Sequence, residues 1–177
     1  FDRLSAQVAY VMAVYRHRPQ TIAALEKMVD AYAEERSSEI GEVGSDCRIV
    51  GARFIREVRI GNGVEIDGAS ILENATLCDG ARVGVDVKAY DLIAAEGSVI
   101  DNGSIVERCF VGESCRLDKG FTAAESLFFA NSHCENGEAA SIFAGPYTVS
   151  HHKSSLLIAG MFSFFNAGSG SNQSNHL

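Results

Sequence analysis

The chain has 177 residues, of which 46% are hydrophobic and 21% are charged, and its formal net charge at pH 7 is −8. A domain of this length can bury a core, and its abundant Leu, Ile, Val and Phe exclude a disordered chain. The acidic charge argues against nucleic acid as the main partner, and no apolar run is long enough to span a membrane. Phe1 follows no Met or apolar leader, so we expect no signal peptide and a processing boundary here.

The first 37 residues predict a helical hairpin. Pro19 is placed to begin the second helix, and the polar run at 34–38 ends it. Each helix has one apolar stripe, so the pair must pack on the rest of the chain or on a partner. The apolar residues that recur at spacings of three and four are Leu4, Val8, Val11, Met12 and Tyr15, then Ile22, Leu25, Met28, Val29 and Tyr32.

From residue 40 onward an aliphatic residue recurs about every six positions. This period fits neither a helix nor an alternating strand. It is typical of a parallel β-helix of hexapeptide repeats, in which short strands and tight turns stack an inward aliphatic column. We therefore predict a mainly β fold, with the hairpin over 1–37 and the β-helix over 40–177, at about 18 residues per coil. The longest run in strict register is Ile93, Val99, Ile105, Val111 and Leu117.

A small residue often follows four places after the aliphatic one, as at Gly97 and Gly103. Cys47, Cys109 and Cys115 fall in this position, so we interpret them as buried filler and not as nucleophiles. The five cysteines include no closely spaced pair, which excludes a zinc ribbon. Unpaired thiols suit a reducing compartment, so we expect a cytoplasmic protein.

The period is interrupted twice. A gap of ten residues between Val83 and Ile93 predicts an extruded loop around 88–91. Insertions in solenoids often build the binding site, although a plain surface bulge explains this loop equally well. The pattern weakens again after Leu117, where the expected inward residues are Phe121, Leu127, Phe128 and Phe129.

This repeat region resembles the bacterial hexapeptide-repeat transferases, the left-handed parallel β-helix family. The resemblance implies a left-handed coil and a homotrimer with active sites in grooves between neighbouring helices. It also implies transfer of an acyl group from coenzyme A or acyl carrier protein to a sugar or an amine. Flat β-helix sides and an unpaired end edge agree with self-association.

The C-terminal stretch is more specific. The segment 166–171, followed by Asn175, resembles the Asn-x-Gly-x-Gly-Thr…Asn-Tyr element of the acetyltransferase half of N-acetylglucosamine-1-phosphate uridyltransferases. His152-Lys153-Ser154 resembles the Lys-Lys-Ser element of the same family, and the block 145–177 also resembles an uncharacterised transferase-like β-helix family. The two elements lie closer together here, and the family's catalytic histidine falls in the missing part. Because the sequence stops just after the motif, we expect further coils beyond Leu177.

Acyl transfer needs a base for the incoming group, and histidine is the natural base near neutral pH. The candidates are His151 and His152, which would point to opposite faces of an extended strand, so only one could face a groove. A solvated patch on a turn is an equal interpretation of the pair. Lys153 would contact an anion such as a phosphate.

The substrate-binding candidates belong to the C-terminal motif. Asn166 and Asn175 would bind sugar hydroxyls or instead stack in a ladder along the β-helix. Gly168 and Gly170 would offer backbone amides to the oxyanion or simply form corners.

The sequence thus predicts an acyltransferase-like protein that moves an acyl group from coenzyme A to a sugar or nucleotide sugar. Coenzyme A is a co-substrate, and we expect no bound cofactor and no metal. The γ-class carbonic anhydrases share the fold, but their zinc-binding spacing is absent among His133, His151, His152 and His176. The alternative is a non-catalytic β-helix scaffold.

Overall fold

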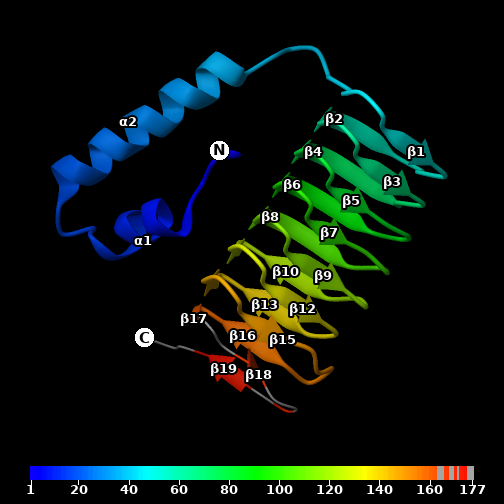
Figure 1. Cartoon of the computed structure of the whole chain (residues 1–177). Helices are drawn as coiled ribbons and strands as arrows, with labels where there is room; N and C mark the ends of the chain where they lie inside the picture. The colour runs from blue at the N-terminus through cyan, green and yellow to red at the C-terminus, as the bar shows by residue number, and fades with distance from the viewer. Residues whose placement is uncertain (163–165, 168–169, 171, 175–177) are drawn as a thin grey trace. The chain divides into compact units, whose positions relative to one another are not determined.

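The computed structural model describes residues 1–162, 166–167, 170 and 172–174. The chain divides into two compact units, Phe1–Ile40 and Gly41–Leu177 (Figure 1). The first unit contains α1 (Ala6–Val14) and α2 (Pro19–Arg36). The strands of the second unit are β1 (Arg48–Val50), β2 (Ile55–Ile60), β3 (Glu65–Asp67), β4 (Ile71–Leu77), β5 (Arg82–Val83), β6 (Lys88–Ala94), β7 (Val99–Ile100), β8 (Ile105–Val111), β9 (Arg116–Asp118), β10 (Thr122–Ala124), β11 (Leu127–Phe128), β12 (His133–Glu135), β13 (Glu138–Ala140), β14 (Phe143–Ala144), β15 (Val149–Ser150), β16 (Leu156–Ile158), β17 (Met161–Phe162), β18 (Asn166–Ala167) and β19 (Asn172–Ser174).

The two predicted helices are confirmed. Ser5 caps α1 by accepting a hydrogen bond from the backbone N–H of Val8 at 3.3 Å, and Pro19 stands in the first turn of α2. The apolar stripe of α2 is half-buried, except that Met28 is exposed. The ring of Phe1 packs edge-on against that of Tyr32, with centroids 5.1 Å apart, which joins the segment before α1 to α2.

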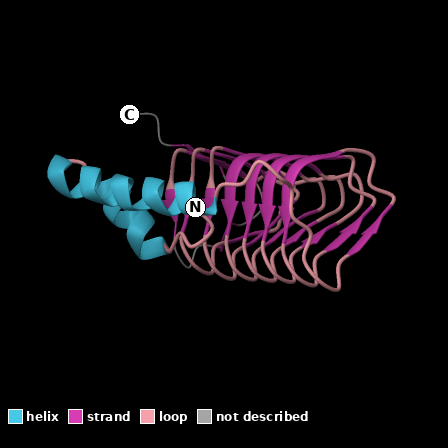
Figure 2. Ribbon diagram, turned by 90° about the horizontal axis from the view of Figure 1, so that it is seen from above, coloured by secondary structure: helices cyan, strands magenta, loops and turns pink. Residues whose placement is uncertain are grey.

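The second unit is a parallel β-helix, as predicted. One sheet has eight strands in the order β1-β3-β5-β7-β9-β12-β15-β18, and every pair is parallel. The other sheet begins with the long strands β2, β4, β6 and β8, and continues as the two rows β10-β13-β16-β19 and β11-β14-β17. Figure 2 shows the successive coils in a row.

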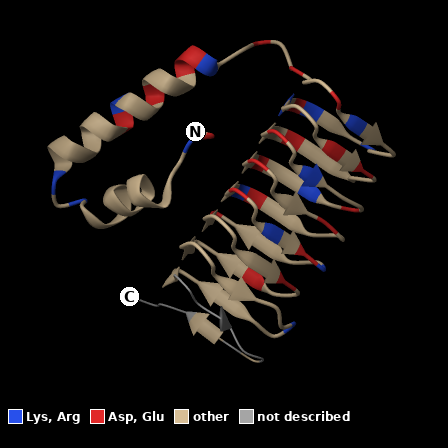
Figure 3. Cartoon of the chain, viewed as in Figure 1, with Lys and Arg blue, Asp and Glu red and all other residues tan. Residues whose placement is uncertain are grey.

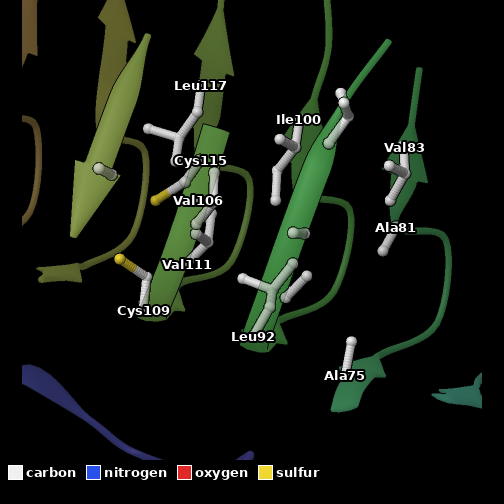
Figure 4. Close-up of a cluster of buried hydrophobic side chains, with 14 of the residues drawn as sticks. Ala75, Ala81, Val83, Leu92, Ile100, Val106, Cys109, Val111, Cys115 and Leu117 are labelled. Atoms are coloured by element: carbon white, nitrogen blue, oxygen red, sulfur yellow. The ribbon is translucent and has the colours of Figure 1, made fainter. Parts of the chain in front are cut away.

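The coil contains 17 residues up to β12, where we predicted about 18, and paired strands beyond it are 16 to 18 residues apart. Ile66, Val83, Ile100 and Leu117 are successive Cα partners in the first sheet, and their numbers differ by 17 at each step. All four side chains are fully buried in the core, and Figure 4 shows three of them, Val83, Ile100 and Leu117. Seventeen residues cannot be divided into three sides of six, so one side of each of these 17-residue coils is a residue shorter.

Because of this short side, the prediction that all five residues of the strict six-residue run point inward is wrong at three positions. Ile93 and Val99 are half-buried and Ile105 is exposed. The inward positions belong to their neighbours Leu92, Ile100 and Val106. For the same reason the small inward residues are Ser98 and Ser104, whereas Gly97 and Gly103 form corners with positive φ.

The loop predicted around 88–91 is also wrong. These residues belong to β6, which pairs with β4 and β8 on both sides of Asp91 in one register, and Ala89 is fully buried. Asp91 has a φ of 50°, so the strand turns a corner there without inserted residues. Residues with similar φ values stand at the same corner of other coils, namely Glu57, Asn74, Arg108, Glu125, Ser141 and Ala159.

An insertion does occur, at the corner after β15. Ser150 pairs with Cys134, and Leu156 pairs with Glu138. Six positions separate Ser150 from Leu156, whereas four separate their partners, so this corner has two more residues than the coil on which it stacks. The segment 151–155 is therefore the enlarged corner.

Two of the four residues expected to point inward after Leu117 do so. Phe121 and Phe128 are fully buried inward, but Phe129 lies outside the inward core, with ring centroids 5.6 Å from Phe110 and 5.0 Å from Phe143. Leu127, also expected inward, is only half-buried.

The three cysteines assigned as filler lie in or against the core. Cys109 and Cys115 are buried, and burial raises the pKa of each thiol to about 11, so they are poor nucleophiles. Cys47 is partly buried and packs against the same core. All five cysteines of the chain are free thiols.

Candidate functional site

The candidate site lies on the outer face of the eight-stranded sheet, at β12 and the enlarged corner. His133 and Glu135 are two residues apart on β12, so both side chains point outward. His133 Nε2 lies 2.9 Å from Glu135 Oε1, and Lys119 Nζ donates to Glu135 Oε2 at 2.5 Å. Only 10% of the Glu135 side chain is exposed, although it stands on an outer face.

The protonation of Glu135 sets the tautomer of His133. Burial by itself raises the pKa of Glu135, but hydrogen bonds from Lys119 and His133 outweigh it and hold this pKa below its usual range. An ionised carboxylate can only accept hydrogen bonds, so Nε2 of His133 carries the proton that it donates to Glu135. Nδ1 of His133 is then directed away from Glu135.

His151, in the enlarged corner, brings a second imidazole to this pair. Its ring packs edge-on against that of His133, with centroids 4.5 Å apart and an interplanar angle of 71°. Burial, and then the charge of His133, lower the pKa of His151, so its ring is neutral at pH 7. Within the described part of the chain, the His151 ring makes no hydrogen bond, which leaves a lone pair for a ligand.

A second covered carboxylate lies one coil earlier. Asp118 accepts hydrogen bonds from Asn102 Nδ2 at 2.7 Å, Arg116 Nε at 2.9 Å and the backbone N–H of Lys119 at 2.6 Å. Its side chain is 3% exposed. Burial raises its pKa, but these hydrogen bonds together lower the pKa below the ordinary value. Asp118 thereby holds the backbone of Lys119, which in turn contacts Glu135.

The predicted alternation of His151 and His152 between two faces is wrong. Because β15 ends at Ser150, both histidines stand in the corner and both are exposed. The backbone carbonyl of His152 accepts a hydrogen bond from the N–H of Ser155 at 3.0 Å. Lys153 is exposed in the same corner, so three of the predicted site residues are adjacent in space.

The C-terminal motif is only partly described. Asn166 lies in β18, where its backbone is the partner of Val149. The N–H of Gly170 donates to Ser154 Oγ at 2.9 Å, so this amide already has an acceptor and is not offered to an oxyanion. Gly168 and Asn175 lie outside the described residues.

Sequence reasoning missed Lys119 and Glu135 and gave His133 no role. The available signal was their spacing, because Lys119, Glu135 and His151 follow one another at intervals of 16 residues, close to one coil. A search of the sequence for side chains about one coil apart, in place of six residues apart, would have placed these three residues in one group.

No group of three or more His, Cys, Asp or Glu side chains in the described part of the chain is arranged to hold a metal ion. Neither described helix is long and apolar enough to cross a membrane.

The fold and this cluster define a parallel β-helix protein with a histidine–carboxylate group on an outer sheet face. The chain belongs to the family described as a domain of unknown function, DUF4954, whose model matches residues 1–177. That description assigns no transferase activity. No curated protein matches the sequence.

Proposed function

We propose that the protein is an acyltransferase that moves an acyl group from coenzyme A to a sugar or nucleotide sugar, with His151 as the base. The observation that carries the proposal is the contact of the neutral His151 ring with His133, which Glu135 holds in place. A base supported by a second group that a carboxylate orients is the arrangement by which proteins activate hydroxyl and amine nucleophiles.

In this mechanism the acceptor hydroxyl or amine gives its proton to His151 as its oxygen or nitrogen attacks the thioester carbonyl. The C–S bond then breaks, and the imidazolium of His151 returns the proton to the departing thiolate. The negative charge of Glu135 favours the charged form of His151, so it stabilises the imidazolium while it exists.

Two lysines supply positive charge beside the base. Lys119 contacts Glu135 but its side chain remains more than half exposed, and Lys153 is exposed in the enlarged corner. Both are placed to attract the phosphates of coenzyme A or of a nucleotide sugar. Asn166, Gly168 and Asn175 retain the substrate-binding role that the family resemblance implies.

The proposal includes a homotrimer in the cytoplasm. The cluster stands on an outer sheet face, so the side of a second copy would enclose it and exclude water. The five free cysteines support a reducing compartment.

A scaffold without catalysis is the second candidate, and a specific observation favours it. Ion pairs link the coils along the same sheet where no histidine is present, at Arg48–Asp67 and Arg82–Glu65. Figure 3 shows basic and acidic positions on these strands. The Lys119–Glu135 pair also joins two coils, so it would serve to hold the β-helix together in a protein without activity.

The test is turnover of acetyl-coenzyme A against a panel of amino sugars and nucleotide sugars. We expect His151→Asn to lower kcat by about 10²- to 10⁴-fold, the usual contribution of a general base. His152→Asn separates the two neighbouring histidines, and the matched control is His17→Asn, in the helical unit, which is expected to keep full activity.

Two results would contradict the proposal. Full activity of His151→Asn would remove this histidine from the mechanism. No turnover by the parent protein with any acceptor, together with intact assembly, would favour the scaffold.

A further inference from the structure

The first coil of the β-helix leaves its inward side chains partly exposed. Its three inward residues are 37% to 60% exposed, whereas the residues on which they stack in the second coil are at most 3% exposed. Within the described residues no further coil covers them, so the apolar column ends at a surface. The exposed residues are Val43, Ile49 and Ile55, and their partners are Ile60, Ile66 and Leu72. We call this surface the open end.

The open end also includes the outer edges of β1 and β2, at one end of the row of coils (Figure 1). β1 pairs with β3 and β2 pairs with β4, and no strand of the described residues lies on their other side. Soluble proteins usually block such an edge with lysine, proline or a bulge. β1 contains no lysine or proline, and its residues Ile49 and Val50 are 41% and 46% exposed. The open end therefore combines unpaired backbone groups with apolar side chains.

The charge of the first coil favours a second copy of the chain as the partner. Residues 41–57 have no net charge, although the whole chain has a net charge of −8. The basic residues are Arg48, Arg53 and Arg56, and the acidic ones are Glu42, Asp46 and Glu57. Arg48 and Arg56 pair with carboxylates of the second coil, so these two charges are directed away from the open end. Two acidic chains can therefore meet here with little repulsion.

The shape of the open end is compatible with a twofold axis. β2 turns a corner at Glu57, where φ is 53°, so its two halves lie on two sides of the coil and β1 lies on the third. An axis through the middle of β1 and this corner places β1 opposite its own copy and each half of β2 opposite the other half. Strands related in this way run antiparallel, which allows them to pair. A helix or a small molecule cannot supply backbone groups along all three sides.

We propose that two copies of the chain associate through their open ends about this twofold axis. The inward columns of the two β-helices then meet, and the exposed inward residues of both first coils become interior. Ile49 is the middle residue of β1, so Ile49 of one copy lies beside Ile49 of the other. The contact closes after two copies and does not rest on the proposed function. In a homotrimer it joins two trimers.

The test is sedimentation velocity of the whole chain at micromolar concentration. We expect Ile49→Lys and Ile49→Glu, each alone, to have about half the parent's mass, because two like charges would be buried side by side. An equimolar mixture of the two variants should regain the parent's mass, since opposite charges then meet across the axis. The matched control is Val85→Lys, at an exposed corner on the flank of the coils, and it should keep the parent's mass.

Hydrogen exchange locates the contact. Backbone amides of β1 and β2 should exchange more slowly in the parent than in Ile49→Lys, because pairing protects the two edges. Amides of β9 and β12, which lie several coils away, should exchange equally in both proteins and so show that the variant is folded.

Three results would overturn the inference: equal masses of the parent and both variants, lost association that the mixture does not restore, or open-ended polymers of the parent. The first of these, with the mass of a trimer throughout, would still agree with the proposed homotrimer. A twofold association that depends on Ile49, in a protein without acyl transfer, would contradict the proposed function and leave this inference standing.

Discussion

Two regions of the same sheet show how one register produces different electrostatics. Near β1 and β3 the Arg48–Asp67 pair has side chains that are 55% and 54% exposed. Near β9 and β12 the carboxylates of Asp118 and Glu135 are almost covered, although they too stand on the outer face. The exposed pair contributes little to stability, whereas a covered carboxylate must be fully partnered.

The covering has a local cause. The position after the inward aliphatic residue is acidic in both regions, but Gly84 occupies it between Asp67 and Asp101 and interrupts the column. In the later coils the position is filled three times in succession, by Asp101, Asp118 and Glu135, and cationic or imidazole side chains contact the last two. The same β-helix therefore has solvent-exposed ion pairs between coils in one region, and a histidine that a covered carboxylate holds in place in the other.

The largest expected effect tests whether the two regions share one core. Ile66→Ala and Leu117→Ala, both at fully buried inward positions, should each lower the free energy of unfolding by about 2–5 kcal/mol. Val99→Ala, at a half-buried outward position, is the control and should cost far less. Urea denaturation measures all three, and a Val99→Ala loss as large as that of Leu117→Ala would contradict the inward register.

The second prediction contrasts the two carboxylate environments. Glu135→Gln removes a covered charge that two side chains contact, so the free energy of unfolding should fall by about 1–3 kcal/mol. Glu65→Gln, in the exposed Arg82–Glu65 pair, should change it little. Denaturation at pH 7 in low salt compares the two variants. Equal losses of unfolding free energy would show that covering the carboxylate makes no difference to its contribution.

Acid should act on the covered region first. The pKa values of Asp118 and Glu135 are lowered in the folded protein, so their contribution is complete above the unfolded values near 4 and is lost as pH falls through the folded ones. The melting temperature of the parent should therefore drop below about pH 4. Asp118→Asn combined with Glu135→Gln should flatten this drop, and an unchanged slope would place the acid sensitivity elsewhere.

The smallest effect concerns His151. Its pKa is lowered in the folded state, so the unfolded chain takes up a proton at higher pH than the folded protein does. Its contribution to stability is present above about pH 6.5 and is lost below it. Between pH 7 and pH 5 the parent should lose a small part of its stability that His151→Asn does not lose. Parallel stability curves for the two proteins would argue against the lowered pKa.

Most of the architecture could be predicted from local patterns. Pro19 and the polar run after Glu34 marked the second helix, and the spacing of aliphatic residues indicated a parallel β-helix. The small residues in the repeat identified Cys109 and Cys115 as core filler. These features are local because helix periodicity and short strands depend on a few neighbouring residues.

The site could be predicted only in part. His151 and Lys153 were selected from their residue types and a motif, and they do lie together in the enlarged corner. His133 and Glu135 could not be grouped with them from the sequence. An average period of six residues does not show which side of a coil has five residues or which corner has two inserted residues.

The sequence by itself determined the order of helices and strands, the coiled architecture and the chemical character of the interior. Only the tertiary structure decided which aliphatic residues face inward and which side chains meet across coils. The physical reason is that backbone hydrogen bonds between coils require a whole number of residues per coil, set here by corner residues in the left-handed region. That register, and not distance along the chain, brings Lys119, Glu135 and His151 together.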